Sequence, residues 1–172
     1  MIPTHPTVCY HTTTHSSINR CSISIVRSGP NVLSIDISGQ NLRILPWIVI
    51  QSRNTLIHLI ADGNLLNENA LNMPIFPRLK TLSIDFNMVR RIPTLLHNLH
   101  KSCPQLTSLS LIGNPGWFPP SWARNERILK QYRKTVLTML PYLHSIDART
   151  TEKLPRNSKW IDSTSSSGDE SA

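Results

Sequence analysis

The chain has 172 residues, of which 39% are hydrophobic, and a formal net charge of +8 at pH 7. That length suits one compact domain with tails, and the apolar fraction is enough for a core but too low for a membrane protein. The longest apolar run near the repeats, "ILPWIVI", has seven residues, far fewer than the ~20 of a transmembrane helix. The basic residues are scattered without interleaved aromatics, which favours a solvated basic surface over a direct nucleic-acid site.

Residues 1–30 are expected to form an N-terminal flank that is mobile or takes no determined structure. Its start, "MIPTHPTVCYH", has no basic segment followed by an apolar one, so we expect no secretory signal. Several possible metal ligands crowd this flank: His5, Cys9, His11, His15 and Cys21. Their spacing fits no zinc signature, so we expect no metal and no other cofactor. Three cysteines make no disulfide framework and favour a reducing, intracellular setting, although Cys9 and Cys21 could pair.

A template then recurs four times, with apolar residues at offsets 0, +3 and +5 and an amide side chain at +8. It begins at Val32, Leu56, Leu79 and Leu106, which we number repeats one to four. The steps are 24, 23 and 27 residues, within the roughly 20–29 residues of leucine-rich repeats. The pattern predicts an α/β fold: a leucine-rich-repeat solenoid with short parallel strands on a concave face and a helical or irregular convex side. The predicted domain covers residues 31–150.

The residues at +3 and +5 should point into the core, and those at +2, +4 and +6 should face outward along the sheet. The position at +8 carries Asn64, Asn87 and Asn114, and Gln40 in repeat one. An amide can donate and accept, so stacked asparagines would satisfy backbone groups at a buried turn. Gln40 is one methylene longer, so repeat one should be looser.

The predicted outer face is rich in hydroxyl groups and mildly acidic, which could suit a protein partner with basic or hydrogen-bonding groups. An alternative is that such residues are merely tolerated on a crowded exposed sheet. The partner-binding candidates here are Asp36, His58, Asp62, Ser83, Asp85 and Ser110. Exposed carboxylates contribute little to folding, so we expect the aspartates to matter for binding rather than for stability.

Three aromatic side chains complete the candidate set. Phe86 occupies offset +7, where the other repeats have Gly39, Gly63 and Gly113, and could be a packing filler or an anchor. Trp117 and Phe118 lie between repeat four and the next helix, where they could seal a joint or present an exposed anchor.

The end of the array predicts a helix-and-strand cap. After Ser121, an amphipathic pattern places Tyr132 on an apolar face that runs to Leu140, and Pro141 stops the helix. The segment "LHSIDA" then repeats the offsets 0, +3 and +5 without the asparagine. Asp147 can accept backbone donors where the chain leaves this last strand. Such a cap would cover the apolar edge of repeat four.

The cap segment "YRKTVLTMLPYLHSIDA" resembles the carboxy-terminal cap of intracellular leucine-rich repeat proteins, shared with the spliceosomal U2 A′ protein. The segments "FPRLKTLSIDFNMVRRIPTLLHNLHKSCPQLTSLSLIGN" and "NERILKQYRKTVLTMLPYLHSIDA" resemble the family of leucine-rich melanocyte differentiation-associated proteins. The resemblance covers roughly residues 32–149. The linker "PGWFPPSWAR" and Gln40 depart from the family pattern, and the tail is shorter than the family's.

The resemblance implies a non-catalytic, cytoplasmic adaptor in the biogenesis and traffic of lysosome-related organelles such as melanosomes. It implies a protein partner, of the Rab-type small GTPase class or a trafficking complex, and organelle association through partners. A ribonucleoprotein assembly subunit of the U2 A′-like class is the alternative. No carboxylate pair, nucleophile with a base, or phosphate loop is found in the sequence, so an enzyme is not expected. A monomer is expected, and residues 151–172 are expected to be a disordered polar tail.

Overall fold

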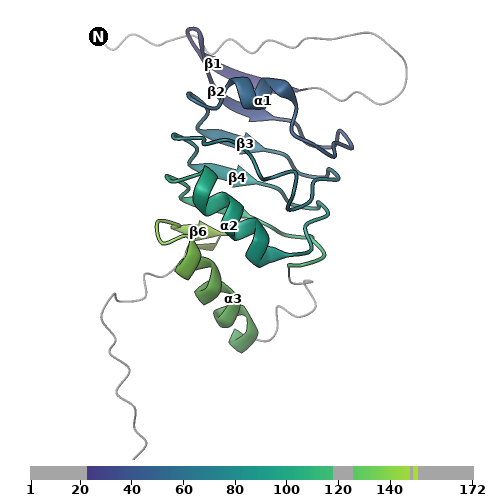
Figure 1. Cartoon of the computed structure of the whole chain (residues 1–172), viewed down its shortest axis with the longest axis vertical. Helices are drawn as coiled ribbons and strands as arrows, with labels where there is room; N and C mark the ends of the chain where they lie inside the picture. The colour runs from purple at the N-terminus through teal and green to yellow at the C-terminus, as the bar shows by residue number, and fades with distance from the viewer. Residues whose placement is uncertain (1–22, 118–125, 148, 151–172) are drawn as a thin grey trace, which may run out of the picture.

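The computed structural model describes residues 23–117, 126–147 and 149–150. The histidines and cysteines of the flank, Phe118 and the polar tail therefore lie outside the described residues. Seven strands form one sheet in chain order (Figure 1). They are β1 (Ser24–Ser28), β2 (Asn31–Asp36), β3 (His58–Ile60), β4 (Thr81–Ser83), β5 (Ser108–Ser110), β6 (Ser145–Ile146) and β7 (Arg149–Thr150).

The strands from β2 to β6 pair in parallel and repeat the same register at each step. Their shared offset, +3, is occupied by residues that pair in turn across the sheet: Ile35, Leu59, Leu82, Leu109 and Ile146. Each of these side chains is buried, as are the residues at +5 of repeats one to four. The predicted mixed α/β architecture with a parallel sheet is confirmed.

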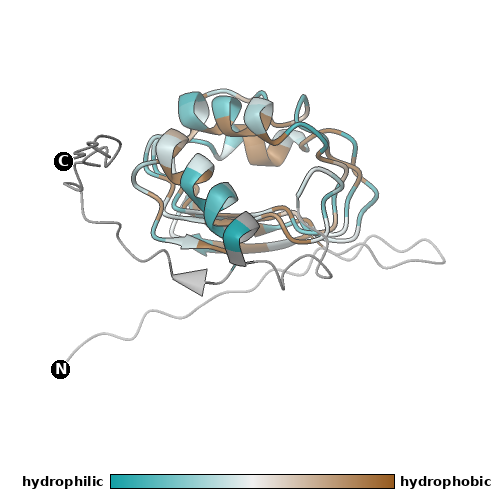
Figure 2. Ribbon diagram, turned by 90° about the horizontal axis from the view of Figure 1, so that it is seen from below, coloured by the Kyte–Doolittle hydropathy of each residue, from teal (hydrophilic) through white to brown (hydrophobic). Residues whose placement is uncertain are grey.

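Three helices accompany the sheet: α1 (Trp47–Gln51), α2 (Ile92–Ser102) and α3 (Glu126–Met139). Figures 1 and 2 show α1 and α2 across one face of the sheet, with the core between them. The sequence of α2 explains this position, because Ile92, Leu95, Leu96 and Leu99 recur at helical spacing and are all buried. The opposite face of the sheet has no helix over it in the described part of the chain.

The sheet begins at Ser24, before the domain boundary at residue 31 that the sequence predicted. Gly29, with φ 57°, turns the chain so that β1 pairs antiparallel with β2. Ile23 and Ile25 pack against the core from this side. The strand β1 thus covers the edge of repeat one, which an open array must protect.

At the other end, α3 turns Val136 and Leu140 into the core and leaves Arg127, Lys130 and Lys134 exposed. Leu143 and Ile146 follow as buried residues, and β6 joins the sheet in parallel with β5. The helix is described over Glu126–Met139, and the predicted start near Ser121 lies outside the described residues. The cap therefore extends the core beyond repeat four by one helix and one short strand.

Candidate functional site

The uncovered side of the sheet, which we call the outer sheet face, is formed by the side chains at offsets +2 and +4. Its members are Ser34, His58, Thr81, Ser108, Asp36, Ile60, Ser83 and Ser110. Those at +2 pair with one another from strand to strand, and so do those at +4. His58 is exposed and the others are half-buried. Five of these eight side chains carry a hydroxyl group and Ile60 is the one aliphatic member, while Val26 of β1 pairs with Ser34 and adds an exposed apolar side chain at the edge.

Asp62 and Asp85, at offset +6, each hydrogen-bond to the next repeat. The Asp62 Oδ1 atom accepts the Asp85 N–H at 2.8 Å and the Ser83 hydroxyl at 2.7 Å. Asp85 repeats this pattern one step on, with Oδ1 accepting the Ile112 N–H at 2.7 Å and Oδ2 accepting the Ser110 hydroxyl at 2.9 Å. These bonds connect successive repeats through groups that the strands leave unpaired.

Related bonds occur at both ends of the array. Ser38 takes the place of an aspartate in repeat one, and its hydroxyl accepts the Asp62 N–H at 3.3 Å. In the cap, Asp147 lies at offset +4 and bonds in the opposite direction, since its Oδ1 accepts the N–H of Leu111 in the preceding repeat at 2.9 Å. We call Asp62, Asp85 and Asp147 the aspartate ladder. Asp36 does not belong to it, because its carboxylate accepts the N–H and the hydroxyl of Ser38 within its own turn.

This arrangement corrects the expectation that the aspartates matter only for binding. They are half-buried acceptors for backbone N–H groups, so their removal would leave those donors without a protein partner. Ser83 and Ser110, which the sequence placed among the partner-binding candidates, also donate to the ladder. These side chains therefore help to connect successive repeats.

Asp85 has an unfavourable electrostatic environment. Burial raises the pKa of Asp85 above its usual range, and the charges of Asp62 and Asp147 raise it further, although the bonds from Ser110 and Ile112 act in the opposite direction. In the described part of the chain the one ion pair is between Arg91 and Glu68, away from the ladder. The ladder therefore concentrates negative charge that no neighbouring cation neutralises within the described residues.

Phe86 directly follows Asp85 and has the backbone conformation of a glycine. Its φ is 52°, and the glycines at the same offset, Gly39, Gly63 and Gly113, have φ of 68°, 62° and 74°. This left-handed region costs a side chain roughly 1–2 kcal/mol. The residue is nevertheless 64% exposed. It lies against Gly113 so closely that a Cβ atom there would be 2.4 Å from the Phe86 Cδ1 atom.

Trp117, predicted either to seal a joint or to be an exposed anchor, is buried. Its Nε1–H donates to the Asp147 Oδ2 atom at 2.7 Å, and its ring meets that of Tyr132 edge-on with centroids 5.5 Å apart. Tyr132 belongs to α3 and Asp147 follows β6, so the three residues join repeat four to the cap. Burial removes Trp117 from the candidate partner surface, while Phe118 lies outside the described residues.

Asn64, Asn87 and Asn114, the asparagine ladder, lie inside the turn that follows each strand and are buried. The Asn87 amide nitrogen donates to the carbonyls of Ala61 and Ile84 at 2.9 and 3.1 Å, while its Oδ1 accepts the Leu66 N–H at 3.0 Å. Asn64 and Asn114 bond to their own and the preceding repeat in the same way. The ladder satisfies buried backbone groups of two repeats at each step.

Gln40 begins the asparagine series but does not reproduce it. Its backbone N–H donates to Asn64 Oδ1 at 3.0 Å, yet its side-chain Nε2 is buried without a hydrogen-bond partner in the described residues. A buried donor without an acceptor is costly. Repeat one therefore has weaker turn contacts than repeats two to four.

Glu68 is a buried contact between repeats that the sequence reasoning missed. Its Oε1 lies 2.9 Å from Arg91 Nε, and its Oε2 accepts the Arg90 N–H at 3.1 Å. Burial opposes its charge, but the bonds from Arg91 and from backbone N–H groups outweigh this and lower the pKa of Glu68 to about 2. Glu68 and Arg91 both lie at offset +12, in repeats two and three. Opposite charges at the same offset of neighbouring repeats were the signal in the sequence that could have predicted this contact.

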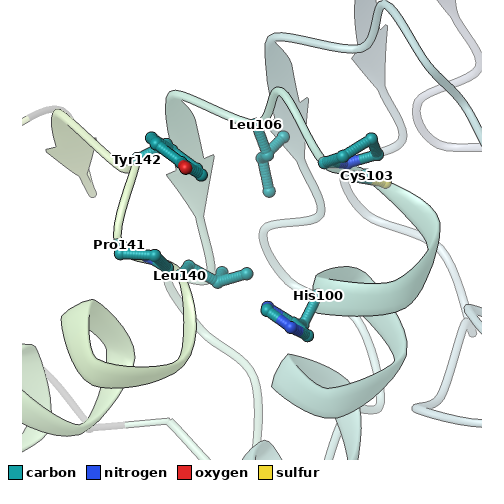
Figure 3. A pocket seen from close by; sticks show the side chains of 7 residues that line it. His100, Cys103, Leu106, Leu140, Pro141 and Tyr142 are labelled. Atoms are coloured by element: carbon teal, nitrogen blue, oxygen red, sulfur yellow. The ribbon is translucent and has the colours of Figure 1, made fainter.

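A pocket of about 230 Å³ lies where the end of α2 meets the cap (Figure 3). Figure 3 shows His100 and Cys103 on one side and Leu140, Pro141 and Tyr142 on the other. Cys103 has a free thiol, and burial raises its pKa to about 12, so it is not a thiolate at neutral pH. The pocket thus offers mostly apolar surface, and its thiol is not activated.

No group of three metal-ligating side chains gathers anywhere in residues 23–117, 126–147 and 149–150. Within the same ranges, none of the helices has the length and hydropathy needed to cross a bilayer. The candidate site is therefore a surface. It consists of the outer sheet face, the aspartate ladder along its edge and the ring of Phe86.

A known human protein is similar to this chain in sequence. Over 110 residues the chain is 36% identical to the human (Homo sapiens) leucine-rich melanocyte differentiation-associated protein. The chain is similar to a leucine-rich repeat protein. The matched segment is 62% of this chain and 54% of that relative, so the match spans about half the length of the curated relative. The resemblance seen in the sequence is thereby confirmed.

No family model matches the chain. Among solved structures, the crystal structure of the Drosophila melanogaster SNF/U2A′ complex contains a chain with a TM-score of 0.45 and 18% sequence identity, covering 86% of this chain and 81% of that one.

Proposed function

We propose that the protein is a non-catalytic adaptor that binds protein partners through the outer sheet face of a leucine-rich-repeat solenoid. The observation that carries the proposal is the 36% identity to a leucine-rich melanocyte differentiation-associated protein across the matched segment. A parallel sheet with one face uncovered supports it, because repeat arrays commonly bind partners through such a face.

Within that role we propose a cytoplasmic protein that associates with lysosome-related organelles through its partners. The name of the relative, which refers to melanocyte differentiation, supports this choice of cellular process. A Rab-type small GTPase or a trafficking complex is the partner class that the resemblance implies. The protein would then hold partners together without chemistry of its own.

Proximity labelling in pigment cells, with the labelling enzyme fused to the full chain, tests the proposal. We expect Rab-type GTPases and trafficking proteins to be labelled. A blocked variant, with Thr81→Arg and Ser108→Arg, puts two long side chains on the outer sheet face and should lose that labelling. Neither side chain donates to the aspartate ladder, so the fold should be kept.

The matched control carries Gln51→Arg and His97→Arg, at exposed positions of α1 and α2 on the opposite side. It should label the same proteins as the native chain. Labelling of splicing proteins instead of trafficking proteins would reject the trafficking role in favour of ribonucleoprotein assembly. Equal labelling by the blocked variant would move the interface away from the outer sheet face.

A further inference from the structure

The side chain of Phe86 is exposed on a backbone that favours glycine. At the same offset, repeats one, two and four have glycine with φ between 62° and 74°. Repeat three alone puts an aromatic ring there, and 64% of that residue is exposed. A ring that served only the core would be buried. Packing therefore explains the side of the ring that lies against Gly113, and not the exposure of the rest.

The ring is also held in one place before any partner arrives. The Phe86 N–H donates to the Ile112 carbonyl at 2.7 Å, and the preceding Asp85 is fixed by bonds on both sides. Contact with Gly113 limits rotation of the ring toward repeat four. A side chain fixed in this way loses little conformational entropy when a partner binds.

Two carboxylates belong to the residues that lead up to Phe86. Asp85 is its neighbour in the chain, and Asp62 bonds directly to the Asp85 N–H. The Asp62 Oδ2 atom accepts no hydrogen bond from the described residues, and each Asp85 oxygen accepts one bond where it could take two. The acceptor capacity that remains adjoins an exposed aromatic ring.

We propose that Phe86, Asp62 and Asp85 together form a docking site for an arginine side chain of a protein partner. The guanidinium group would stack on the open face of the Phe86 ring and donate to the unused carboxylate lone pairs. Charge complementarity selects this occupant, because the ladder is negative and no described cation neutralises it. The site deepens the proposed adaptor function and rests on it, since the arginine must come from a partner.

Other occupants fit less well. An apolar side chain could cover the ring but would remove water from the carboxylates without replacing its hydrogen bonds. An ammonium group is compact and strongly hydrated, whereas a guanidinium is planar, weakly hydrated and able to stack and donate at once. Phosphate groups, on lipids or nucleic acids, would be repelled by the aspartates.

A small probe tests the site without knowledge of the partner. The full chain, labelled with ¹⁵N, is titrated with Nα-acetyl-arginine amide while backbone amide shifts are recorded. We expect saturable shifts confined to Asp85, Phe86 and Gly113 and their neighbours, with a dissociation constant in the millimolar range. Nα-acetyl-lysine amide should bind more weakly, and the neutral citrulline analogue should give no saturable shift.

Variants distinguish the contribution of the Phe86 ring to binding from its contribution to folding. Phe86→Gly should abolish the shifts while the melting temperature stays the same or rises, because glycine suits this backbone in the other repeats. Phe86→Leu keeps apolar bulk and should also lose binding. Asp62→Asn keeps the Oδ1 acceptor and should weaken binding roughly two- to fivefold, as expected for a partly exposed charge. Tyr142→Ala, which removes an aromatic residue that is 65% exposed, is the control and should bind like the native chain.

Three results would overturn the proposal: no saturable shift with the arginine probe, equal shifts in Phe86→Gly, or an equal response to citrulline. A melting temperature that falls strongly in Phe86→Gly would assign the ring to packing instead. Because the titration needs no cellular partner, its failure is distinguishable from failure of the adaptor role, which proximity labelling tests.

Discussion

Two ladders connect the same repeats and differ in where they lie. The asparagine ladder is buried inside the turns and uses the donors and acceptors of each amide. The aspartate ladder lies at the edge of the outer sheet face, is half-buried, and can only accept. A buried amide must satisfy every neighbouring backbone group, because no water is available there. A half-buried carboxylate supports the fold and retains lone pairs that no described residue uses.

The largest expected effect is on the buried ladder. Asn87→Ala should lower the free energy of unfolding by about 3 kcal/mol, because the Leu66 N–H and the Ala61 and Ile84 carbonyls lose their partner. Urea unfolding followed by circular dichroism measures this loss. Asn67→Ala, at an exposed turn, is the control and should cost clearly less. Equal costs would contradict the special role of the buried position.

A second test concerns the buried carboxylate on the helical side. Glu68→Gln should destabilise by about 2 kcal/mol at neutral pH, because Arg91 loses its charged acceptor. The pKa of Glu68 is lowered from 4.5 to about 2, so its stabilisation is present above pH 4.5 and is lost as the pH falls toward 2. The difference between native chain and variant should therefore shrink across that window. A difference that is constant with pH would show that the charge is not responsible.

The aspartate ladder should give a smaller loss. Asp85→Ala should lower the free energy of unfolding by about 1 kcal/mol, since the Ile112 N–H and Ser110 hydroxyl lose an acceptor that water can partly replace. Thermal and urea melts would measure it. A loss as large as that of Asn87→Ala would remove the distinction between the two ladders. No loss would restore the view that these aspartates are only surface charges.

The smallest effect is expected where the asparagine ladder begins. Gln40→Asn should leave the stability unchanged or raise it by up to about 0.5 kcal/mol, because the buried Nε2 donor without a partner is replaced by a shorter amide. A urea titration can resolve the direction if native and variant proteins are measured together. A clear loss would mean that Gln40 makes a contact which asparagine cannot make.

The core of this fold was readable from the sequence because its residues follow a strict spacing. The offsets +3 and +5 predicted Ile35, Leu59, Leu82 and Leu109 as buried, and they are. Alternation failed at offset +6, since β3, β4 and β5 are three residues long and end at +4. Beyond a strand, the direction of a side chain is set by the turn and not by the pleat. Asp62 and Asp85 therefore turned toward the next repeat.

Other features depended on contacts that no short pattern contains. The strand β1 pairs antiparallel and lies outside the repeat template, so the spacing did not include it. The sequence correctly placed Trp117 at a joint. Whether its side chain is buried or exposed depends on contacts with Asp147 and Tyr132, which lie 30 and 15 residues further along the chain. The sequence showed that Phe86 occupies an offset where the other repeats have glycine. It did not show that the ring lies against Gly113.

The contact between Phe86 and Gly113 makes these two positions mutationally interdependent. With the ring in place, any side chain at position 113 would overlap it, since even a Cβ atom would lie 2.4 Å from Cδ1. When position 86 is glycine, that overlap is absent. A residue other than glycine at position 113 then meets only the strain of this backbone conformation, where φ is 74°. The order of substitution therefore matters. A double-mutant cycle of Phe86→Gly with Gly113→Ala should show non-additive free energies, and an evolutionary path that changes position 113 passes most readily through loss of the ring.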